Sequence, residues 1–160
     1  MLRKLGLAFA LSLAACNSSA VADPPPAALD PANRDSMTER LELMVGDVQK
    51  SVSFYTGTLG FELVFSETDY AVVRAGKFSL GLNAASSLSS SHYFNPELGT
   101  QRRGLGAEIV LEVNDVTNYY AAVTQAKGTI LSPLTRRPWG ATDFRVADPD
   151  GYYLRITSRN

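Results

Sequence analysis

A short segment near the carboxyl end of the chain carries an arginine between apolar residues. Residues 148–157, DPDGYYLRIT, begin with a Pro/Gly turn and continue as a strand whose side chains alternate between two faces. Arg155 therefore lies on the opposite face from Leu154 and Ile156. A guanidinium has five N–H donors and no lone pair. It can grip a carboxylate or phosphate, or pair with an acidic side chain, but it cannot ligate a metal ion.

Strict alternation in two other segments, 40–45 and 108–113, assigns further residues to such a face. The side chains expected there, with those of the last strand of each half, are Arg40, Glu42, Met44, Ser79, Asn83, Glu108, Val110, Glu112, Tyr153 and Arg155. This surface is polar and carries both charge signs, which suits a polar small molecule. Glu108, with Glu42 or Glu112 from neighbouring positions, also offers acid/base chemistry.

The loop RRPWGATDF contributes the only tryptophan of the chain. Trp139 could stack on a planar ligand, or it could be a core aromatic that seals one end of a sheet. Arg136 and Arg137 are expected in solvent, where they could steer an anion. His92, the only histidine, is expected at the surface of a Ser-rich loop. The sequence contains no nucleophile–base pair, phosphate-binding glycine loop or dinucleotide fingerprint.

An internal repeat shows which elements position these residues. LMVGDVQKSVSFYTGTLGF and LEVNDVTNYYAAVTQAKGT align without a gap, so the two halves are interpreted as one duplicated unit. In each copy an alternating strand is followed by an aspartate, Asp47 or Asp115, that can cap a helix. Apolar residues then follow at helical spacing, and Gly60 and Gly128 are expected to close the two helices.

Three short strand-like runs follow each predicted helix. They cover residues 62–66, 70–74 and 78–83 in the first half, and 129–131, 142–146 and 152–157 in the second. The pattern predicts an α+β fold of two βαβββ units. Its helices should cover one face of a curved mixed sheet and leave a concave cleft on the other.

Three motifs in this order resemble one known superfamily. VGDVQKSVSFYTGTLGFEL, LEVNDV and WGATDFRVADPDGYYLRI are similar to the vicinal oxygen chelate superfamily, which holds glyoxalases, extradiol dioxygenases and bleomycin resistance proteins. The resemblance covers residues 38–158 and implies a domain over 37–160. Its units would span about 38–83 and 106–158, joined by a linker loop at about 84–105. It also implies that the Trp139 segment lies beside the mouth of the cleft.

Metal-dependent members of this superfamily hold a divalent ion with His and Glu side chains. Carried over by the resemblance, those positions fall on Arg40, Gly81, Glu108 and Arg155. Three of these four residues cannot ligate a metal, so no metal cofactor is expected. Arg40, Glu108 and Arg155 are interpreted either as a buried ion-pair cluster that replaces the metal, or as a grip for an anionic ligand.

Three functions follow from this reading of the site. The first is a metal-independent small-molecule binding protein of the bleomycin-resistance type. The second is a glyoxalase-like lyase or dioxygenase with a divergent metal or acid/base site, and the third is an accessory lipoprotein that contacts another protein. The expected ligand is anionic or planar and would be held by Arg40, Glu42, Asn83, Glu108, Trp139, Tyr153 and Arg155. A homodimer is expected because relatives pair such units to complete the cleft.

Length and composition favour one globular domain. The chain has 160 residues, of which 45% are hydrophobic and 19% charged, with a formal net charge of −1. No basic surface indicates nucleic-acid binding. Cys16 is the only cysteine, so the chain forms no internal disulfide.

The first residues have the pattern of an export signal. A positive start is followed by the apolar run 5–13, which is too short to span a bilayer. The next residues, LAAC, resemble the lipobox of bacterial lipoproteins, which implies that residues 1–15 are removed and Cys16 is lipidated. Cleavage after Ala22, or an uncleaved anchor, are the alternatives. Residues 16–36 are rich in Pro, Ala and Ser and are expected to be a tether.

The expected location is therefore the bacterial cell envelope, with the domain in the periplasm. Asn17 follows the lipidated cysteine instead of the aspartate associated with inner-membrane retention, which favours the outer membrane.

Replacing the lipidated cysteine should release the protein from the membrane. In a Cys16→Ser chain no acyl groups can be attached, and a multi-chain lipid anchor binds far more firmly than any single-chain attachment. Membrane fractionation with detection of the intact chain measures the effect. Membrane association equal to that of the wild type would contradict the lipoprotein assignment.

Overall fold

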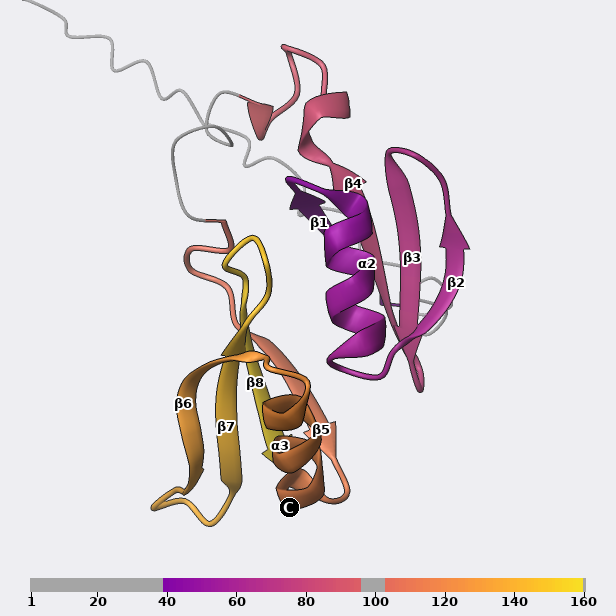
Figure 1. Ribbon diagram of the computed structural model, residues 1–160. Helices are drawn as coiled ribbons and strands as arrows, with labels where there is room; N and C mark the ends of the chain where they lie inside the picture. The colour runs from indigo at the N-terminus through magenta and orange to yellow at the C-terminus, as the bar shows by residue number, and fades with distance from the viewer. Residues whose placement is uncertain (1–38, 96–102, 160) are drawn as a thin grey trace, which may run out of the picture. The chain divides into compact units, whose positions relative to one another are not determined.

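The first half of the domain folds as a βαβββ unit. The computed structural model describes residues 39–95 and 103–159, which belong to one unit of the chain. Figure 1 shows their helices and strands. The predicted signal peptide, Cys16 and the tether lie outside the described residues. The elements of this half are β1 (Leu41–Val45), α2 (Val48–Gly57), β2 (Glu62–Ser66), β3 (Tyr70–Ala75) and β4 (Phe78–Ala84).

The second half repeats this order. A short 3-10 helix, η1 (Ala85–Ser87), follows β4. The elements of the second half are β5 (Ile109–Val113), α3 (Val116–Gln125), β6 (Thr129–Arg136), β7 (Thr142–Ala147) and β8 (Tyr153–Ser158). The predicted α+β fold of two βαβββ units is thus confirmed.

Each half builds its own four-stranded mixed sheet. The strand order is β1-β4-β3-β2 in the first sheet, here called sheet A, and β5-β8-β7-β6 in the second, sheet B. In both, the first strand runs parallel to the last and the other pairs are antiparallel. The two sheets therefore repeat the same topology, as the internal sequence repeat predicts.

Strand β6 is longer than its sequence pattern indicates. The alternation predicted a strand over residues 129–131, whereas the structure continues it to Arg136. Pro133 lies within this extension, and the pairing with β7 shifts register on both sides of Ser132. Proline removes a backbone donor and is tolerated only at a sheet edge or at a bulge. Strand β6 is an edge strand, and its register shifts lie beside Pro133.

Both helices begin at the predicted aspartates. The Asp47 side chain accepts a hydrogen bond from the Lys50 backbone N–H at 3.0 Å, and Asp115 accepts one from Asn118 at 2.9 Å. Each such cap stabilises a helix by about 1 kcal/mol. Neither α2 nor α3, nor η1, has the length and apolar character needed to cross a bilayer.

The ends of the two helices differ from the prediction. Gly60 has a positive φ of 70° after α2, but after α3 the residue with positive φ is Lys127, at 59°. Gly128 is required for space: a Cβ there would lie 2.7 Å from Val123 Cγ1. The Gly128 N–H does close α3, because it donates to the Val123 carbonyl at 2.9 Å, but the left-handed residue of this cap is Lys127.

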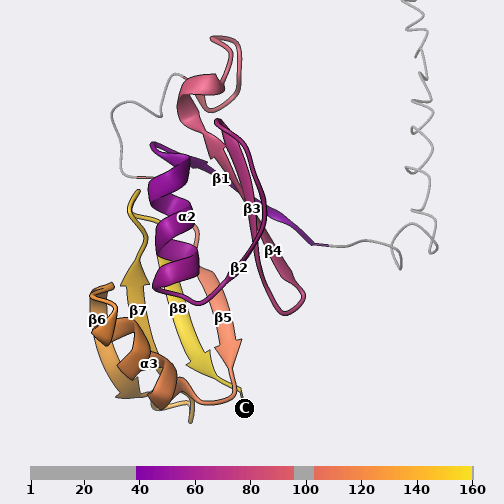
Figure 2. The ribbon, with the colours of Figure 1, turned by 45° about the vertical axis from the view of Figure 1, so that its right-hand side comes forward.

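A single cluster of buried apolar side chains lies between the helices and the sheets. Leu43 and Val45 of β1 belong to it, as do Leu154 and Ile156 of β8. Tyr55 of α2 is fully buried in the same cluster. Burying each large apolar side chain contributes about 1.5–3 kcal/mol. Each helix covers one face of its sheet (Figures 1 and 2), so the alternate side chains lie on the other face, here called the open face.

The turn that precedes β8 connects the two halves through Asp150. Its carboxylate accepts a hydrogen bond from the Gly46 N–H at 2.8 Å and from the Ser51 hydroxyl at 3.4 Å. The Arg103 side chain forms an ion pair with the same carboxylate, with 3.4 Å between Nε and Oδ1. The DPDG turn thus fixes the end of β1 and the first turn of α2.

Asp148 of the same turn is buried beside the core. One carboxylate oxygen accepts from the backbone N–H groups of Asp150 and Tyr152, at 2.9 and 2.8 Å, and the other accepts from the Tyr55 hydroxyl at 3.2 Å. Burial is the main reason that the pKa of Asp148 is raised to about 6, although the two backbone hydrogen bonds oppose this shift.

Substituting asparagine for Asp148 should remove one pH dependence of stability. Because the pKa is about 6 in the folded chain and about 4 in an unfolded one, the folded state holds the extra proton between these values. This contribution to the free energy of unfolding is fully present below about pH 4 and is lost as the pH rises toward 6, by up to roughly 3 kcal/mol. Urea unfolding of wild type and Asp148→Asn from about pH 4 to about pH 7 measures it.

The comparison must be the difference between the two proteins, because other groups titrate as well. Asp143, whose pKa is lowered, contributes in the opposite sense, since its stabilisation is lost as the pH falls. Parallel curves for wild type and Asp148→Asn would show that Asp148 is ionised throughout.

Candidate functional site

Glu42, on the edge strand β1, is the most highly connected acid on the open face of sheet A. Its carboxylate is 2.6 Å from Arg40 Nε, and it accepts hydrogen bonds from the Tyr70 hydroxyl at 3.1 Å and the Asn83 amide at 2.8 Å. These partners come from β3, β4 and the residue before β1. Burial, followed by the charge of Glu42 and its hydrogen bond, raises the pKa of Tyr70 above its ordinary value. The result is a carboxylate held in one position.

Gly81 provides the space in which this carboxylate lies. A Cβ at Gly81 would be 2.1 Å from Glu42 Oε2 and 2.4 Å from its carboxyl carbon, well inside any real contact. Gly81 and Glu42 are paired across β1 and β4. The glycine on the open face of β4 is therefore explained by the side chain of the neighbouring strand.

Next to the carboxylate, the open face of sheet A carries an aromatic pair. The rings of Phe65 and Tyr70 are 6.1 Å apart and tilted by 50°. Phe65 is exposed. Glu42 and this pair give sheet A an anchored acid beside an accessible aromatic surface, a combination that can bind a ligand with a flat apolar part.

On sheet B, two arginines face each other across neighbouring strands. Arg145 of β7 and Arg155 of β8 are directly paired in the register. Like charges in this position are destabilising unless an acid separates them. Glu108 does so, because its Oε1 lies 3.5 Å from Arg145 Nε and its Oε2 lies 3.3 Å from Arg155 Nε.

Arg145 is held in place by a second acid. Asp143, fully buried on β7, forms ion pairs with Arg145 and with Arg137, the latter at 2.7 Å. Burial alone would raise the pKa of Asp143, but hydrogen bonds and charge from the two arginines outweigh it and hold the pKa below its usual range. Asp143 is therefore ionised at neutral pH and orients both guanidinium groups.

Two buried polar atoms of this cluster make no hydrogen bond within the described residues. They are Asp143 Oδ2 and Arg155 Nε. The Arg155 nitrogen is close enough to Glu108 for an ion pair, yet its N–H is not aligned with the carboxylate. An unsatisfied buried polar group is costly. The cluster can therefore bind a further donor through Asp143 Oδ2 and a further acceptor through Arg155 Nε.

The structure brings some predicted site residues together and separates others. The ion pair between Arg155 and Glu108 is confirmed, and Asn83 joins Glu42 and Arg40. The predicted cluster of Arg40, Glu108 and Arg155 is wrong in one member, because Arg40 pairs with Glu42 on sheet A. The exposed side chain of Arg40 reaches the acid that lies two residues further along the chain.

Two predictions about the loop before β7 are corrected. Trp139 is 62% exposed, so the interpretation as a core aromatic is wrong. Arg137 was expected in solvent, but it pairs with buried Asp143 and also donates to Ser132 Oγ at 3.4 Å. Tyr153 lies on β8, paired in register with Ala147 of β7. Whether Trp139 and Tyr153 contact a ligand stays a prediction.

Sequence reasoning missed three residues of the site: Tyr70, Asp143 and Arg145. The alternation of β7 carried the signal for two of them, because Asp143 and Arg145 alternate with the buried Phe144 and Val146. Tyr70 is the first residue of its strand, and no pattern linked it to Glu42.

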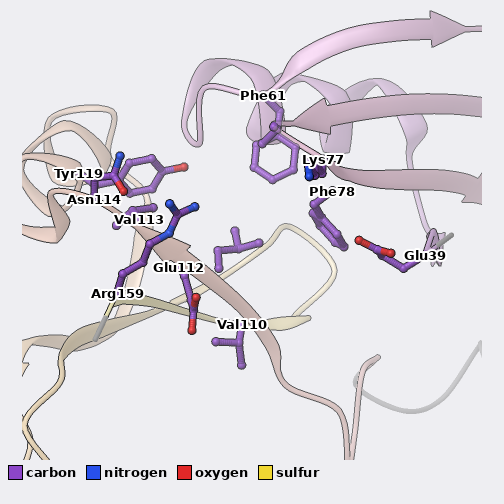
Figure 3. Close-up of a pocket in the computed structure, with 13 residues that line it drawn as sticks. Glu39, Phe61, Lys77, Phe78, Val110, Glu112, Val113, Asn114, Tyr119 and Arg159 are labelled. Atoms are coloured by element: carbon purple, nitrogen blue, oxygen red, sulfur yellow. The ribbon is translucent and has the colours of Figure 1, made fainter. Parts of the chain in front are cut away.

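A groove of about 750 Å³ lies next to β5 (Figure 3). Phe61 and Phe78 line one side, and Val113, Tyr119 and Arg159 line the other. Glu39, Lys77, Val110, Leu111, Glu112 and Asn114 also line it, with Ala75 and Gly76. The Tyr119 hydroxyl donates to the Leu59 carbonyl, and burial raises the pKa of Tyr119 to about 12. The groove has an apolar wall, a charged rim and the size of a small-molecule pocket.

The residues at the metal-ligand positions of this fold do not suit a metal ion. Among residues 39–95 and 103–159, no group of three or more His, Cys, Asp or Glu side chains could hold one. Glu108 is the only possible ligand of the four positions, and two arginines already contact it. A cation there would lie beside fixed positive charge.

Two βαβββ units with helices on one side of each mixed sheet define a duplicated α+β protein with polar open faces. The sequence profile of the Glyoxalase/Bleomycin resistance protein/Dioxygenase superfamily matches residues 38–156. The chain belongs to this superfamily.

Curated relatives and solved structures agree with this assignment. A bleomycin resistance protein of Geobacillus stearothermophilus is 32% identical over 115 residues, which cover 68% of this chain and 86% of the relative. The crystal structure of TioX from Micromonospora sp. ML1 matches with a TM-score of 0.62 and 20% identity, covering 78% of this chain and 99% of TioX. A lactoylglutathione lyase from Agrobacterium tumefaciens matches with a TM-score of 0.61 and 19% identity, covering 77% and 93%. At these identities the two structures show the fold alone.

Adding a methyl group at Gly81 should displace Glu42 and destabilise the fold. Gly81→Ala places a Cβ in the space of the carboxylate, so Glu42 must leave its hydrogen bonds, at an expected cost of about 1–2 kcal/mol. Gly57→Ala is the matched control, because nothing lies within 4 Å of its Cβ and alanine is the better helix former. Chemical denaturation of both variants measures the difference. Equal stability of the two would show that Glu42 moves aside without cost.

Proposed function

We propose that this chain is a metal-independent small-molecule binding protein of the bleomycin-resistance type, anchored in the cell envelope through Cys16. Membership of the superfamily and the 32% identity to a bleomycin resistance protein support the small-molecule part. The lipobox-like run before Cys16 supports the anchor.

The arrangement around Glu108 carries the metal-independent part of the proposal. Arg145 and Arg155 contact both of its carboxylate oxygens, so its charge is already balanced by protein. On sheet A, the Glu42 carboxylate is held by one cation, Arg40, and by two neutral donors, Tyr70 and Asn83. Each open face thus carries charged and polar groups that the protein itself balances, in place of a chelating set. Such groups bind and orient a polar ligand without a cation.

A second copy of the chain would complete the site. Within the described residues, one edge of β1 and one edge of β5 have no strand partner. Leu41 and Val110 on these strands are both exposed. Unpaired edges with apolar side chains favour association with another chain. The proposed active form is a homodimer in which open faces of two copies enclose the ligand.

Native mass spectrometry of gently purified protein tests metal, ligand and subunit number together. The expected spectrum shows a dimer with bound small molecule and no stoichiometric divalent metal. Added metal-free bleomycin, the first probe, should bind equally well with and without a chelator.

Two variants separate a metal role of Glu108 from a structural one. Glu108→Ala should leave the metal content unchanged, as should Glu67→Ala, a control in the exposed segment between β2 and β3. About one zinc, iron, manganese or nickel ion per chain, lost in Glu108→Ala but kept in Glu67→Ala, would overturn the metal-independent proposal and favour the lyase or dioxygenase.

A further inference from the structure

We propose that Arg145 and Arg155 form a clamp for an oxyanion of the ligand, a carboxylate, phosphate or sulfate group, with Glu108 as a displaceable partner. This inference rests on the proposed small-molecule binding function and assigns the chemical class of the ligand. Arg155 occupies one of the metal-ligand positions carried over from metal-dependent relatives, whereas Arg145 occupies none of them.

The charge balance of sheet B is the first argument. Three arginines, at 137, 145 and 155, meet two carboxylates, at 143 and 108, so the cluster has one positive charge in excess. Arg145 and Arg155 are largely buried, with 13% and 25% of their side chains exposed. A partly desolvated guanidinium attracts an anion more strongly than one in water.

The unused donors are the second argument. Glu108 lies within ion-pair distance of the Nε atom of each arginine, and Asp143 accepts from one terminal nitrogen of Arg145. In the described part of the chain, no acceptor is found for the terminal nitrogens of Arg155 or for the other one of Arg145. Arg155 Nε is buried without a hydrogen bond. A ligand oxyanion supplies the acceptors that the protein lacks.

The rigidity of the cluster is the third argument. Asp143 is fully buried, and its Oδ1 pairs with both Arg145 and Arg137, which holds the Arg145 guanidinium in place. Glu108, by contrast, is 37% exposed and makes no aligned hydrogen bond to either clamp residue. The cluster therefore has a fixed half, which orients Arg145, and a loose half, which an anion can replace.

Direct titration of the arginine side chains tests the clamp. The full-length chain, labelled with ¹⁵N, is titrated with sulfate, with benzoate and with benzylammonium, and the Nε–Hε signals are followed by NMR. The signals of Arg145 and Arg155 should shift saturably with sulfate or benzoate and stay unchanged with benzylammonium. Sulfate alone would identify a tetrahedral oxyanion, and benzoate alone a carboxylate. A site that prefers benzylammonium would overturn the proposal.

Two substitutions with a matched control separate binding from stability. Arg155→Lys keeps the charge but loses the planar pair of donors, so oxyanion affinity should fall about tenfold while the fold persists. Arg74→Lys, the same change on the open face of sheet A, where Arg74 pairs with exposed Glu62, should leave affinity unchanged. An equal loss in both would mean that general charge, and no clamp, attracts the anion.

Glu108→Gln gives the sharper outcome. Removing the negative charge of the competing carboxylate should strengthen oxyanion binding several-fold, since a neutral amide competes less well than an anion for the donors of Arg145 and Arg155. A cluster with a purely structural role predicts destabilisation with no gain in affinity, and that result would overturn the proposal. If bleomycin does not bind but Arg145 and Arg155 respond to the oxyanions as expected, the proposed function fails and the clamp stands. If bleomycin binds but the two arginines do not respond to oxyanions, only the clamp is overturned.

Discussion

The open face of sheet B depends on one constraint. Two arginines lie directly opposite each other on adjacent antiparallel strands, and negative charge must offset their mutual repulsion. Arg145 and Arg155 are paired in the register of β7 and β8, and Glu108 lies within 3.5 Å of both. Asp143 adds a buried negative charge behind Arg145. The strands, the two acids and Arg137 therefore form one electrostatic unit. Removing a single acid would leave partly buried positive charge without a partner.

On sheet A the charge of the acid is balanced in a different way. Its acid, Glu42, comes from β1, and the space for it comes from Gly81 on β4. Neutral donors on Tyr70 and Asn83 share the carboxylate with Arg40, so this face has no surplus of charge among these groups. The first half of the domain thus presents an anchored acid on its open face, and the second half presents surplus guanidinium donors. The proposed ligand, which carries an anion, would use the second of these.

The fold could be predicted almost completely from local patterns. Alternation with a period of two placed the apolar faces of β1, β5 and β8, because one side of each strand must be buried under a helix. The capping aspartates Asp47 and Asp115 marked both helix starts, since a helix leaves backbone N–H groups that a nearby side chain must satisfy. Only features without a local signal were missed, such as the extension of β6 through Pro133 and the positive φ of Lys127.

The sequence by itself determined the two βαβββ units, the residue types on each open face and the poor fit of Arg40, Gly81 and Arg155 to a metal. The units and the open faces follow from alternation, which is a property of neighbours along the chain, whereas the metal-ligand positions come from the resemblance to the superfamily. The tertiary structure decided which charges meet. Arg40 pairs with Glu42 and not with Glu108, and Arg145, far from Glu108 in sequence, becomes its partner. Pairing across strands depends on sheet order and register, and the choice between nearby acids depends on the distance that the folded backbone sets.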